Sequence, residues 1–237
     1  LWMAKILTVF NQKGGCGKTM TAMQLAGTCA MRGYSTLVVD MDSQGTALVW
    51  STVKPDPQLR LKATGFPAKV ESFAPLGRGM VRPVAELAPL YDLIIIDTPP
   101  AVASEAPWAA LQISDLALIP FVPTAADMWA KEARVLARKA MEQNPDIRGV
   151  HHLPSMVRRG NTITGVLDQF RSDPEVSLLS SMVSLLNAYL DSQMLGLCVG
   201  QLSSSSTAAK EMSALSDEVL GLLGLTKSVE VKRKGKR

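Results

Sequence analysis

Five short apolar runs recur along the chain, separated by stretches with helical spacing of apolar residues. The runs cover residues 5–10, 36–42, 92–97, 116–122 and 149–156. Their aliphatic residues do not alternate with polar ones, which is typical of parallel strands covered on both faces. We predict helices near residues 18–32, 79–90, 105–113, 125–143 and 162–172. This alternation predicts an α/β fold, with an open, mostly parallel twisted sheet and helices on both of its faces.

Three segments depart from the simple alternation. Residues 52–82 are rich in Pro, Gly and Lys and have weak periodicity, so we expect irregular surface structure there. Residues 176–200 fit a strand followed by a helix, but their boundaries stay open. Residues 206–223 predict an amphipathic helix, whose apolar stripe consists of Met212, Leu215, Val219 and Leu222.

The positive charge of the chain is concentrated at its C-terminal end. The net charge is +4, but residues 227–237 alone contribute six basic residues and one acid, which leaves the other residues at −1. We therefore expect one globular domain over residues 1–224 and a basic, flexible tail over residues 225–237. Such a tail is usually a solvated end. Alternatively, it binds nucleic acid or anionic lipid.

Composition narrows the class of protein. The chain is 47% hydrophobic and 19% charged, which suits a buried core, and no apolar run approaches the roughly 20 residues of a membrane-spanning helix. The first strand leads directly into a glycine-rich turn, so we expect no signal peptide. Cys16, Cys29 and Cys198 are odd in number and widely spaced. This spacing argues against a disulfide framework or a zinc site and suits a reducing cytoplasm.

The glycine-rich turn has the features of a phosphate-binding loop. It reads NQKGGCGKTM over residues 11–20 and lies between the first predicted strand and helix. Glycines let backbone N–H groups approach phosphates, and the helix N-terminus favours negative charge. Lys18 would reach the β- and γ-phosphates of a nucleotide, and Thr19 would ligate Mg²⁺. The strict P-loop pattern has glycine where this chain has Gln12.

Acidic residues follow two further predicted strands. Asp40 and Asp42, in VVDMDSQG, lie on the same side of an extended segment, and Asp97 ends the aliphatic run of LIIIDTPP. Ligands of open α/β sheets gather at the carboxyl ends of the strands. We therefore expect these acids at the nucleotide site. The alternative is that the first pair only caps the following helix.

The motif K-G-G-x-G-K-T at residues 13–19 resembles the deviant Walker A motif of the ParA/MinD family of ATPases. VDMDSQG resembles the switch I motif of that family, with Ser43 in place of a proline, and LIIIDTPP resembles its Walker B strand. LPSMVRR at residues 153–159 and AAKEMSALSDEV resemble later segments more loosely; the first of these lies near the adenine pocket in the family. The resemblance covers about residues 4–224.

This resemblance implies an ATPase with ATP and Mg²⁺ as cofactors and an ATP-dependent homodimer. In the family, the signature lysine, here Lys13, reaches the phosphates of the partner subunit's ATP. The implied catalytic residues are Lys13, Lys18 and Asp42. The implied ATP-binding residues are Lys13, Gly14, Gly15, Cys16, Gly17, Lys18, Thr19 and Met20. The implied magnesium site consists of Thr19, Asp40 and Asp97.

One departure from the family lies within the loop. Met20 replaces a threonine whose hydroxyl contacts the α-phosphate. Loss of that hydrogen bond would lower the affinity for ATP by about 1 kcal/mol. Cys16 is interpreted as a neutral small residue. Nitrogenase iron proteins share the signature lysine, but they hold their cluster with cysteines after the Walker B region. This chain has no cysteine between Cys29 and Cys198, which argues against electron transfer.

Two functions remain. A ParA-like protein would bind DNA nonspecifically and position a plasmid, chromosome or other large cargo, with slow hydrolysis stimulated by a ParB-like adaptor. A MinD-like protein would bind membrane through a C-terminal amphipathic helix. Residues 206–223 contain no aromatic residue, and the basic tail has charge without an apolar face. These features favour DNA. They predict a cytoplasmic, nucleoid-associated protein of the short ParA type, because the P-loop begins at once.

Overall fold

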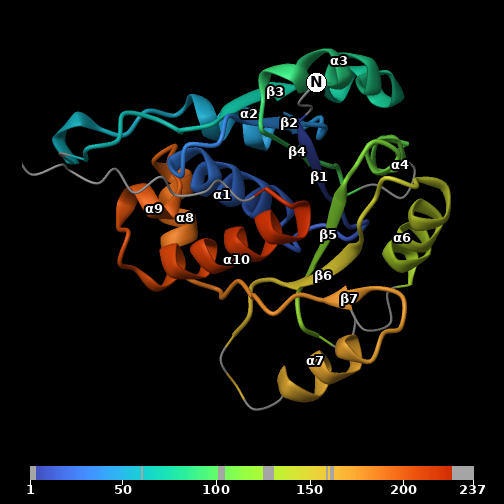
Figure 1. Ribbon diagram of the computed structural model, residues 1–237. Coiled ribbons are helices and arrows are strands. Elements are labelled where there is room, and N and C mark those ends of the chain that lie inside the picture. Colours follow the sequence, from blue (N-terminus) through green and yellow to red (C-terminus); the bar gives the residue numbers. More distant parts are fainter. Residues whose placement is uncertain are drawn as a thin grey trace, which may run out of the picture.

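A seven-stranded sheet forms the centre of the computed structural model, which describes residues 4–59, 61–100, 105–124, 131–158, 160 and 163–225 (Figure 1). All paired strands are parallel, in the order β3-β2-β4-β1-β5-β6-β7. The strands are β1 (Lys5–Val9), β2 (Thr36–Asp40), β3 (Lys69–Ser72), β4 (Leu93–Asp97), β5 (Leu116–Phe121), β6 (Val150–Pro154) and β7 (Ser177–Leu178). The predicted fold class is confirmed.

Helices cover both faces of this sheet (Figure 1). The α-helices are α1 (Lys18–Met31), α2 (Thr46–Thr52), α3 (Val81–Leu87), α4 (Ala106–Leu111), α6 (Glu132–Gln143), α7 (Ile163–Arg171), α8 (Asn187–Met194), α9 (Val199–Leu202) and α10 (Thr207–Leu223). Short 3₁₀ segments are η1 (Pro57–Leu59), η2 (Ala74–Met80) and η3 (Ala88–Leu90). The left-handed backbone of Gly33, with φ of 85°, follows the end of α1.

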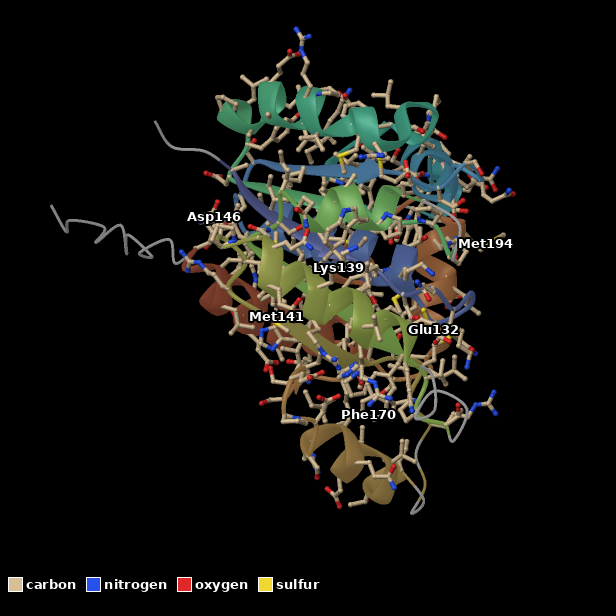
Figure 2. The ribbon with its side chains drawn as sticks, turned by 90° about the vertical axis from the view of Figure 1, so that its right-hand side faces the viewer. Glu132, Lys139, Met141, Asp146, Phe170 and Met194 are labelled. Carbon is tan, nitrogen blue, oxygen red and sulfur yellow. The ribbon has the colours of Figure 1, made fainter. Side chains whose placement is uncertain are left out.

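Alternate residues of each central strand enter different cores, which explains the uninterrupted apolar runs. Ile95 of β4 packs with α1 and α10 on one face, whereas its neighbours Ile94 and Ile96 pack with α3 and α4 on the other. Farther along the second face, α6 covers β5 and β6. Figure 2 views the molecule from this side, where the Lys139 ammonium lies 4.6 Å from the centre of the Trp108 ring. Every residue of β4 is buried.

The prediction of irregular structure over residues 52–82 is wrong in part. That region contains η1, the edge strand β3, all of η2 and the first two residues of α3, and helix α2 ends at its first residue, Thr52. In β3 only Val70 is buried, because the strand pairs with β2 alone and its other positions are polar. An edge strand with one buried residue gives no hydrophobic period from which to predict it.

The ambiguous region 176–200 resolves into β7, α8 and α9. Strand β7 is only two residues long, which is too short for the sequence to define its boundaries. The helix predicted over residues 125–143 begins at Glu132 in α6, and residues 125–130 lie outside the described part of the chain. The helix predicted over 79–90 is divided into the end of η2, then α3 and η3.

Helix α10 has a buried apolar stripe, which confirms the prediction for three of its four residues, whereas Leu222 is only partly buried and its neighbour Leu223 is fully buried. Met212, Leu215 and Val219 are at most 1% exposed and pack in the same core as α1. Within the described residues, no helix is both long and apolar enough to span a bilayer. The basic residues 227–237 lie outside the described part of the chain.

Candidate nucleotide-binding site

The predicted site residues meet at the carboxyl edge of the sheet. Strand β1 lies between β4 and β5 and runs directly into the glycine-rich turn. Its last residue, Val9, is in register with Asp97 of β4, and Asp97 is in register with Asp40 of β2. Three adjacent strands therefore end at the same level. The turn and the two carboxylates lie side by side, as expected for a ligand site in an open α/β sheet.

The turn requires two left-handed glycines before α1 begins. Gly15 and Gly17 have φ of 71° and 88°. At Gly17 there is also no room for a side chain, because a Cβ atom would lie 2.6 Å from the Ser155 hydroxyl oxygen. Gly17 is the N-cap of α1, and no side chain caps this helix end. The N-terminal N–H groups of the helix are thus available to an anionic ligand.

The two lysines of the turn lie in different surroundings. Lys18 is only 6% exposed, and its ammonium donates a hydrogen bond to the Lys13 carbonyl oxygen at 3.0 Å. The side chain of Lys13 is exposed. The Cys16 thiol also donates to the Lys13 carbonyl, at 3.3 Å. Lys18 therefore belongs to the interior of the loop, whereas Lys13 projects from it.

Asn11 connects this turn to β5. Its carboxamide nitrogen donates to the Pro120 carbonyl oxygen at 2.8 Å, and its carboxamide oxygen accepts from the Lys13 N–H at 3.0 Å. The asparagine is 8% exposed. None of the sequence motifs gives this residue a role, although an asparagine two positions before a turn residue is a known signal for such a side chain–backbone bond.

Asp97 is a buried carboxylate that lacks a hydrogen-bond donor. Neither of its oxygens has a hydrogen-bond partner among the described residues, and the side chain is inaccessible to solvent. Burial raises the pKa of Asp97 to about 7. The nearby Thr19 side chain opposes this shift, the charge of Asp40 adds to it, and the charge of Lys18 opposes it. Such a carboxylate is costly unless a cation or a donor satisfies it.

Asp40 and Asp42 differ in exposure and in backbone contacts. Asp40 is buried and accepts hydrogen bonds from the Asp42 N–H at 3.0 Å and the Leu48 N–H at 3.1 Å. Burial raises the pKa of Asp40 even though these bonds lower it. Asp42 is half-buried beyond the end of β2, and it accepts from the Gln44 N–H at 3.0 Å. One carboxylate is therefore fixed in the sheet, whereas the other lies in the loop that follows.

The residues present fit a magnesium ion held together with a nucleotide. The described residues form no cluster of three or more His, Cys, Asp or Glu side chains able to hold a metal by themselves. Mg²⁺ usually keeps several waters and binds one or two carboxylates plus substrate phosphates. The unsatisfied oxygens of Asp97, with Thr19 and Asp40 nearby, supply oxygen ligands of that kind.

The far side of the turn is formed by residues that follow β6. Ser155 is fully buried, its hydroxyl has no hydrogen-bond partner among the described residues, and Met156 has φ of 53°. Met156 also lines a hollow of about 390 Å³, together with Val122, Pro123, Thr124, Arg158, Gly160 and Ile163. The loosely matched LPSM segment therefore does reach the carboxyl edge. Its contact with Gly17 could not be predicted, because the two residues are distant in the sequence.

Met20 packs against both the core and the loop. It is partly buried against the core that contains α1, and its terminal methyl would lie 3.5 Å from a Cβ atom on Gly17. Thr98, which follows Asp97, donates from its hydroxyl to the Val9 carbonyl at 3.0 Å and so fixes the exit of β4 beside β1. Residues 101–104, farther along this exit, lie outside the described residues.

Known proteins share the sequence pattern and the fold. A family model described as the CobQ/CobB/MinD/ParA nucleotide binding domain matches residues 7–236. The maintenance of carboxysome distribution protein A of Halothiobacillus neapolitanus is 26% identical over 220 residues, which cover 90% of this chain and 95% of that protein. The protein of the same name from Gloeobacter kilaueensis is 34% identical over 131 residues, about half of each chain at 52%.

Solved structures share the fold at low sequence identity. Apo McdA of Cyanothece superposes with a TM-score of 0.72 at 17% identity, covering 93% of this chain and 100% of that one. The septum site-determining protein MinD of Pyrococcus horikoshii, complexed with Mg-ADP, superposes with a TM-score of 0.71 at 18% identity. That match covers 96% of this chain and 100% of the other.

Proposed function

Because the chain belongs to the CobQ/CobB/MinD/ParA nucleotide-binding domain family, we propose that it is a magnesium-dependent ATPase that works as an ATP-bound homodimer. The observation that carries this proposal is the separation of the two lysines. Lys18 is buried inside the loop, whereas the Lys13 side chain is exposed at its rim. One lysine is therefore placed to hold the subunit's own phosphates, and the other to reach those of a second subunit.

Each remaining site residue receives a role on this proposal. The backbone of residues 13–20 holds the phosphates, with Thr19, Asp40 and Asp97 holding Mg²⁺ directly or through water. When bound, Mg²⁺ neutralises phosphate charge and orients the terminal phosphate. Asp42 orients the attacking water and accepts its proton, because its carboxylate lies in the loop beyond the fixed end of β2. The hollow lined by Met156 receives the adenine base.

The ATP-bound dimer is proposed to bind DNA nonspecifically and to position a large cargo, with a ParB-like adaptor stimulating hydrolysis. Carboxysome distribution is what two of the relatives are named for, so a protein compartment is one such cargo. Burial of the α10 stripe supports DNA over membrane, since that stripe is occupied in the core and not free to enter lipid. The basic residues 227–237 would then contact phosphates. This function places the protein in the cytoplasm, on the nucleoid.

Co-sedimentation tests this function most directly. The full chain is mixed with duplex DNA or with anionic liposomes, each in the presence of Mg²⁺ with ATP or ADP. We expect pelleting with DNA in ATP and little in ADP, and a loss of DNA binding as salt is raised. ATP-dependent pelleting with liposomes but not with DNA would instead show a MinD-like membrane protein. The proposal as a whole would be contradicted if the chain hydrolyses no ATP and stays monomeric in solution when ATP is added.

A further inference from the structure

Asn11 fixes the backbone N–H of Lys13. The asparagine oxygen accepts from the Lys13 N–H, and the asparagine nitrogen donates to Pro120 at the end of β5. The carboxamide oxygen only accepts and the carboxamide nitrogen only donates, so these two bonds fix the orientation of the Asn11 amide. The Lys13 carbonyl is fixed separately, by the Lys18 ammonium and the Cys16 thiol. Both polar groups of the Lys13 backbone are therefore held.

The direction of the Lys13 side chain depends on this backbone. The side chain is exposed, and a lysine on its flexible four-carbon stem does not direct itself. Positioning a charged group for a reaction requires that the atoms from which it projects be held in place. We propose that Asn11 is a positioning residue that aims Lys13 across the subunit interface by tying its peptide N–H to β5. This inference rests on the proposed role of Lys13 in the nucleotide-bound dimer.

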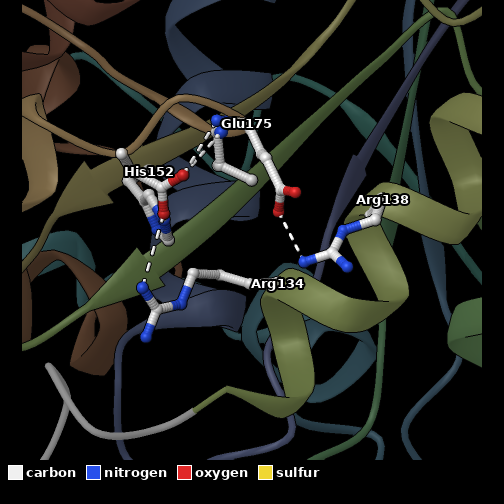
Figure 3. A network of polar contacts seen from close by, with 6 residues as sticks. Arg134, Arg138, His152 and Glu175 are labelled. Carbon is white, nitrogen blue, oxygen red and sulfur yellow. Dashed lines mark hydrogen bonds and ion pairs between the residues drawn. The ribbon is translucent and has the colours of Figure 1, made fainter.

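The surroundings of Asn11 make it hard to replace. It forms part of the wall of an internal cavity of only about 10 Å³, together with residues of β5, α6, β6 and α7 that include Phe121, Arg134 and His152. Figure 3 shows Arg134 and His152 in this part of the molecule. Truncation of Asn11 would enlarge this cavity on the side of the loop. The Lys13 N–H would then lose the acceptor that Asn11 supplies.

A second asparagine provides a matched control. Asn144 is 4% exposed, its oxygen accepts from the N–H two residues later, in Asp146, and its nitrogen donates to the carbonyls of Leu111 and Ser114. It thus makes the same kinds of bond with similar burial. It lies at the opposite end of the sheet, because Ser114 precedes β5 whereas Pro120 is near its end. Asn144→Ala should therefore cost stability without disturbing the loop.

The experiment compares Asn11→Ala, Asn144→Ala, Lys13→Ala and the double variant Asn11→Ala/Lys13→Ala with the unaltered chain. Three quantities are measured in each: the thermal midpoint, the affinity of the monomer for ADP, and the ATP-dependent dimerisation and turnover. Asn11→Ala should reduce ATP-dependent dimerisation and kcat about tenfold, the effect of one well-placed hydrogen bond. Its affinity for ADP should stay within about twofold, since Lys18 is retained. Asn11→Ala and Asn144→Ala should lower the thermal midpoint by similar amounts, but Asn144→Ala should leave kcat unchanged.

The double variant separates positioning from mere stability. If Asn11 acts through Lys13, the double variant should have the same turnover as Lys13→Ala alone. Independent, multiplicative losses would overturn the inference, as would an Asn11→Ala protein with normal dimerisation and turnover. If Lys13→Ala itself dimerises and hydrolyses ATP normally, the proposed function fails first. Should Asn11→Ala not fold, Asn11→Ser carries the same comparison, because its hydroxyl retains an acceptor but cannot span to Pro120.

Discussion

The ammonium of Lys18 donates to the carbonyl oxygen of Lys13 at 3.0 Å, so the buried lysine of the loop holds the backbone of the exposed one. The two side chains nevertheless differ in exposure. We predict that substitutions separate their roles. Lys18→Ala should abolish ATP binding by the monomer. Lys13→Ala should keep that binding, form no dimer under conditions that dimerise the unaltered chain, and retain only a residual turnover, about 100-fold or more below the unaltered value.

Titration with a fluorescent ATP analogue and light scattering with ATP and Mg²⁺ measure these two properties separately. The unaltered chain with ADP is the control for the dimer. A Lys13→Ala protein that doubles its mass on addition of ATP would contradict the assignment of the signature lysine.

Asp42 is predicted to act in turnover rather than in binding. Asp42→Ala should bind ATP and dimerise, but its kcat should fall about 100-fold or more, the usual contribution of a general base. The matched control is Asp56→Ala, because Asp56 also lies in a surface turn and accepts from the N–H two residues later, in Gln58, at 2.8 Å. Phosphate release measures kcat. Normal turnover in Asp42→Ala would assign the water-activating role to another group.

The two glycines that flank α1 should differ in their tolerance of alanine. Gly17 and Gly33 have similar φ, 88° and 85°. A Cβ atom at Gly33 would meet nothing within 4 Å, whereas a Cβ atom at Gly17 would lie 2.6 Å from the Ser155 hydroxyl oxygen. Gly33→Ala should lose only about 1–2 kcal/mol of stability through left-handed strain. Gly17→Ala should in addition displace the loop and abolish nucleotide binding.

Thermal unfolding and an ATP titration of both variants check this comparison. Equal ATP affinity in Gly17→Ala and Gly33→Ala would mean that the loop can move away from Ser155 at no cost to the site.

Protonation of His152 at low pH should oppose folding. This histidine is 2% exposed, lies against the rings of Phe121 and Phe170, and its Nε2 is 3.8 Å from a carboxylate oxygen of Asp173 (Figure 3). Burial lowers the pKa of His152 to about 4. Asp173 opposes this shift, whereas Arg134 and His151 add to it. The folded pKa is below that of the unfolded chain, so the unfolded state binds the proton more readily. The contribution of His152 to stability is therefore lost as pH falls from about 6.5 towards 4, by up to about 3 kcal/mol. The raised pKa of Asp97 has the opposite effect over this range, because there the folded state binds the proton more readily.

Denaturant unfolding at a series of pH values measures this loss. As the pH falls from 6.5 to 4, His152→Leu should gain up to about 3 kcal/mol of stability relative to the unaltered chain. Asp97 is present in both proteins, so its contribution cancels in this difference. Asp173 remains in that variant, and because its own pKa is lowered, its contribution is lost only below that window. An unchanged pH dependence in His152→Leu would place the titrating group elsewhere.

Local patterns were sufficient to predict the centre of the sheet and to identify candidate residues that meet at its carboxyl edge. β1, β2, β4, β5 and β6 are buried on both faces, which gives uninterrupted apolar runs, and the residues of the loop and the strand ends are adjacent to those runs in the sequence. Register then brings Asp40 beside Asp97, as the parallel arrangement implies. The confirmed parts of the fold are the elements whose own residues form an uninterrupted apolar run, together with the parallel arrangement that such runs imply.

The missed parts depend on contacts between distant residues. β3 is defined by its pairing with β2 rather than by its own apolar content. Ser155 matters for the loop only because β6 ends beside Gly17. The Asn11–Pro120 bond likewise joins segments that are far apart in the chain. None of these contacts leaves a periodic signal in the sequence.

The register of Asp40 with Asp97 has a consequence for the rate of the proposed hydrolysis cycle. Both residues belong to neighbouring strands of a hydrogen-bonded ladder, so the separation of their Cα atoms is set by the spacing of those strands. Asp42 is two residues beyond that ladder. On the proposed function, Asp40 and Asp97 would form a fixed magnesium site, and the rate of hydrolysis would be set in the short loop after β2. An adaptor that stimulates hydrolysis would then need to shift only a few backbone atoms of that loop.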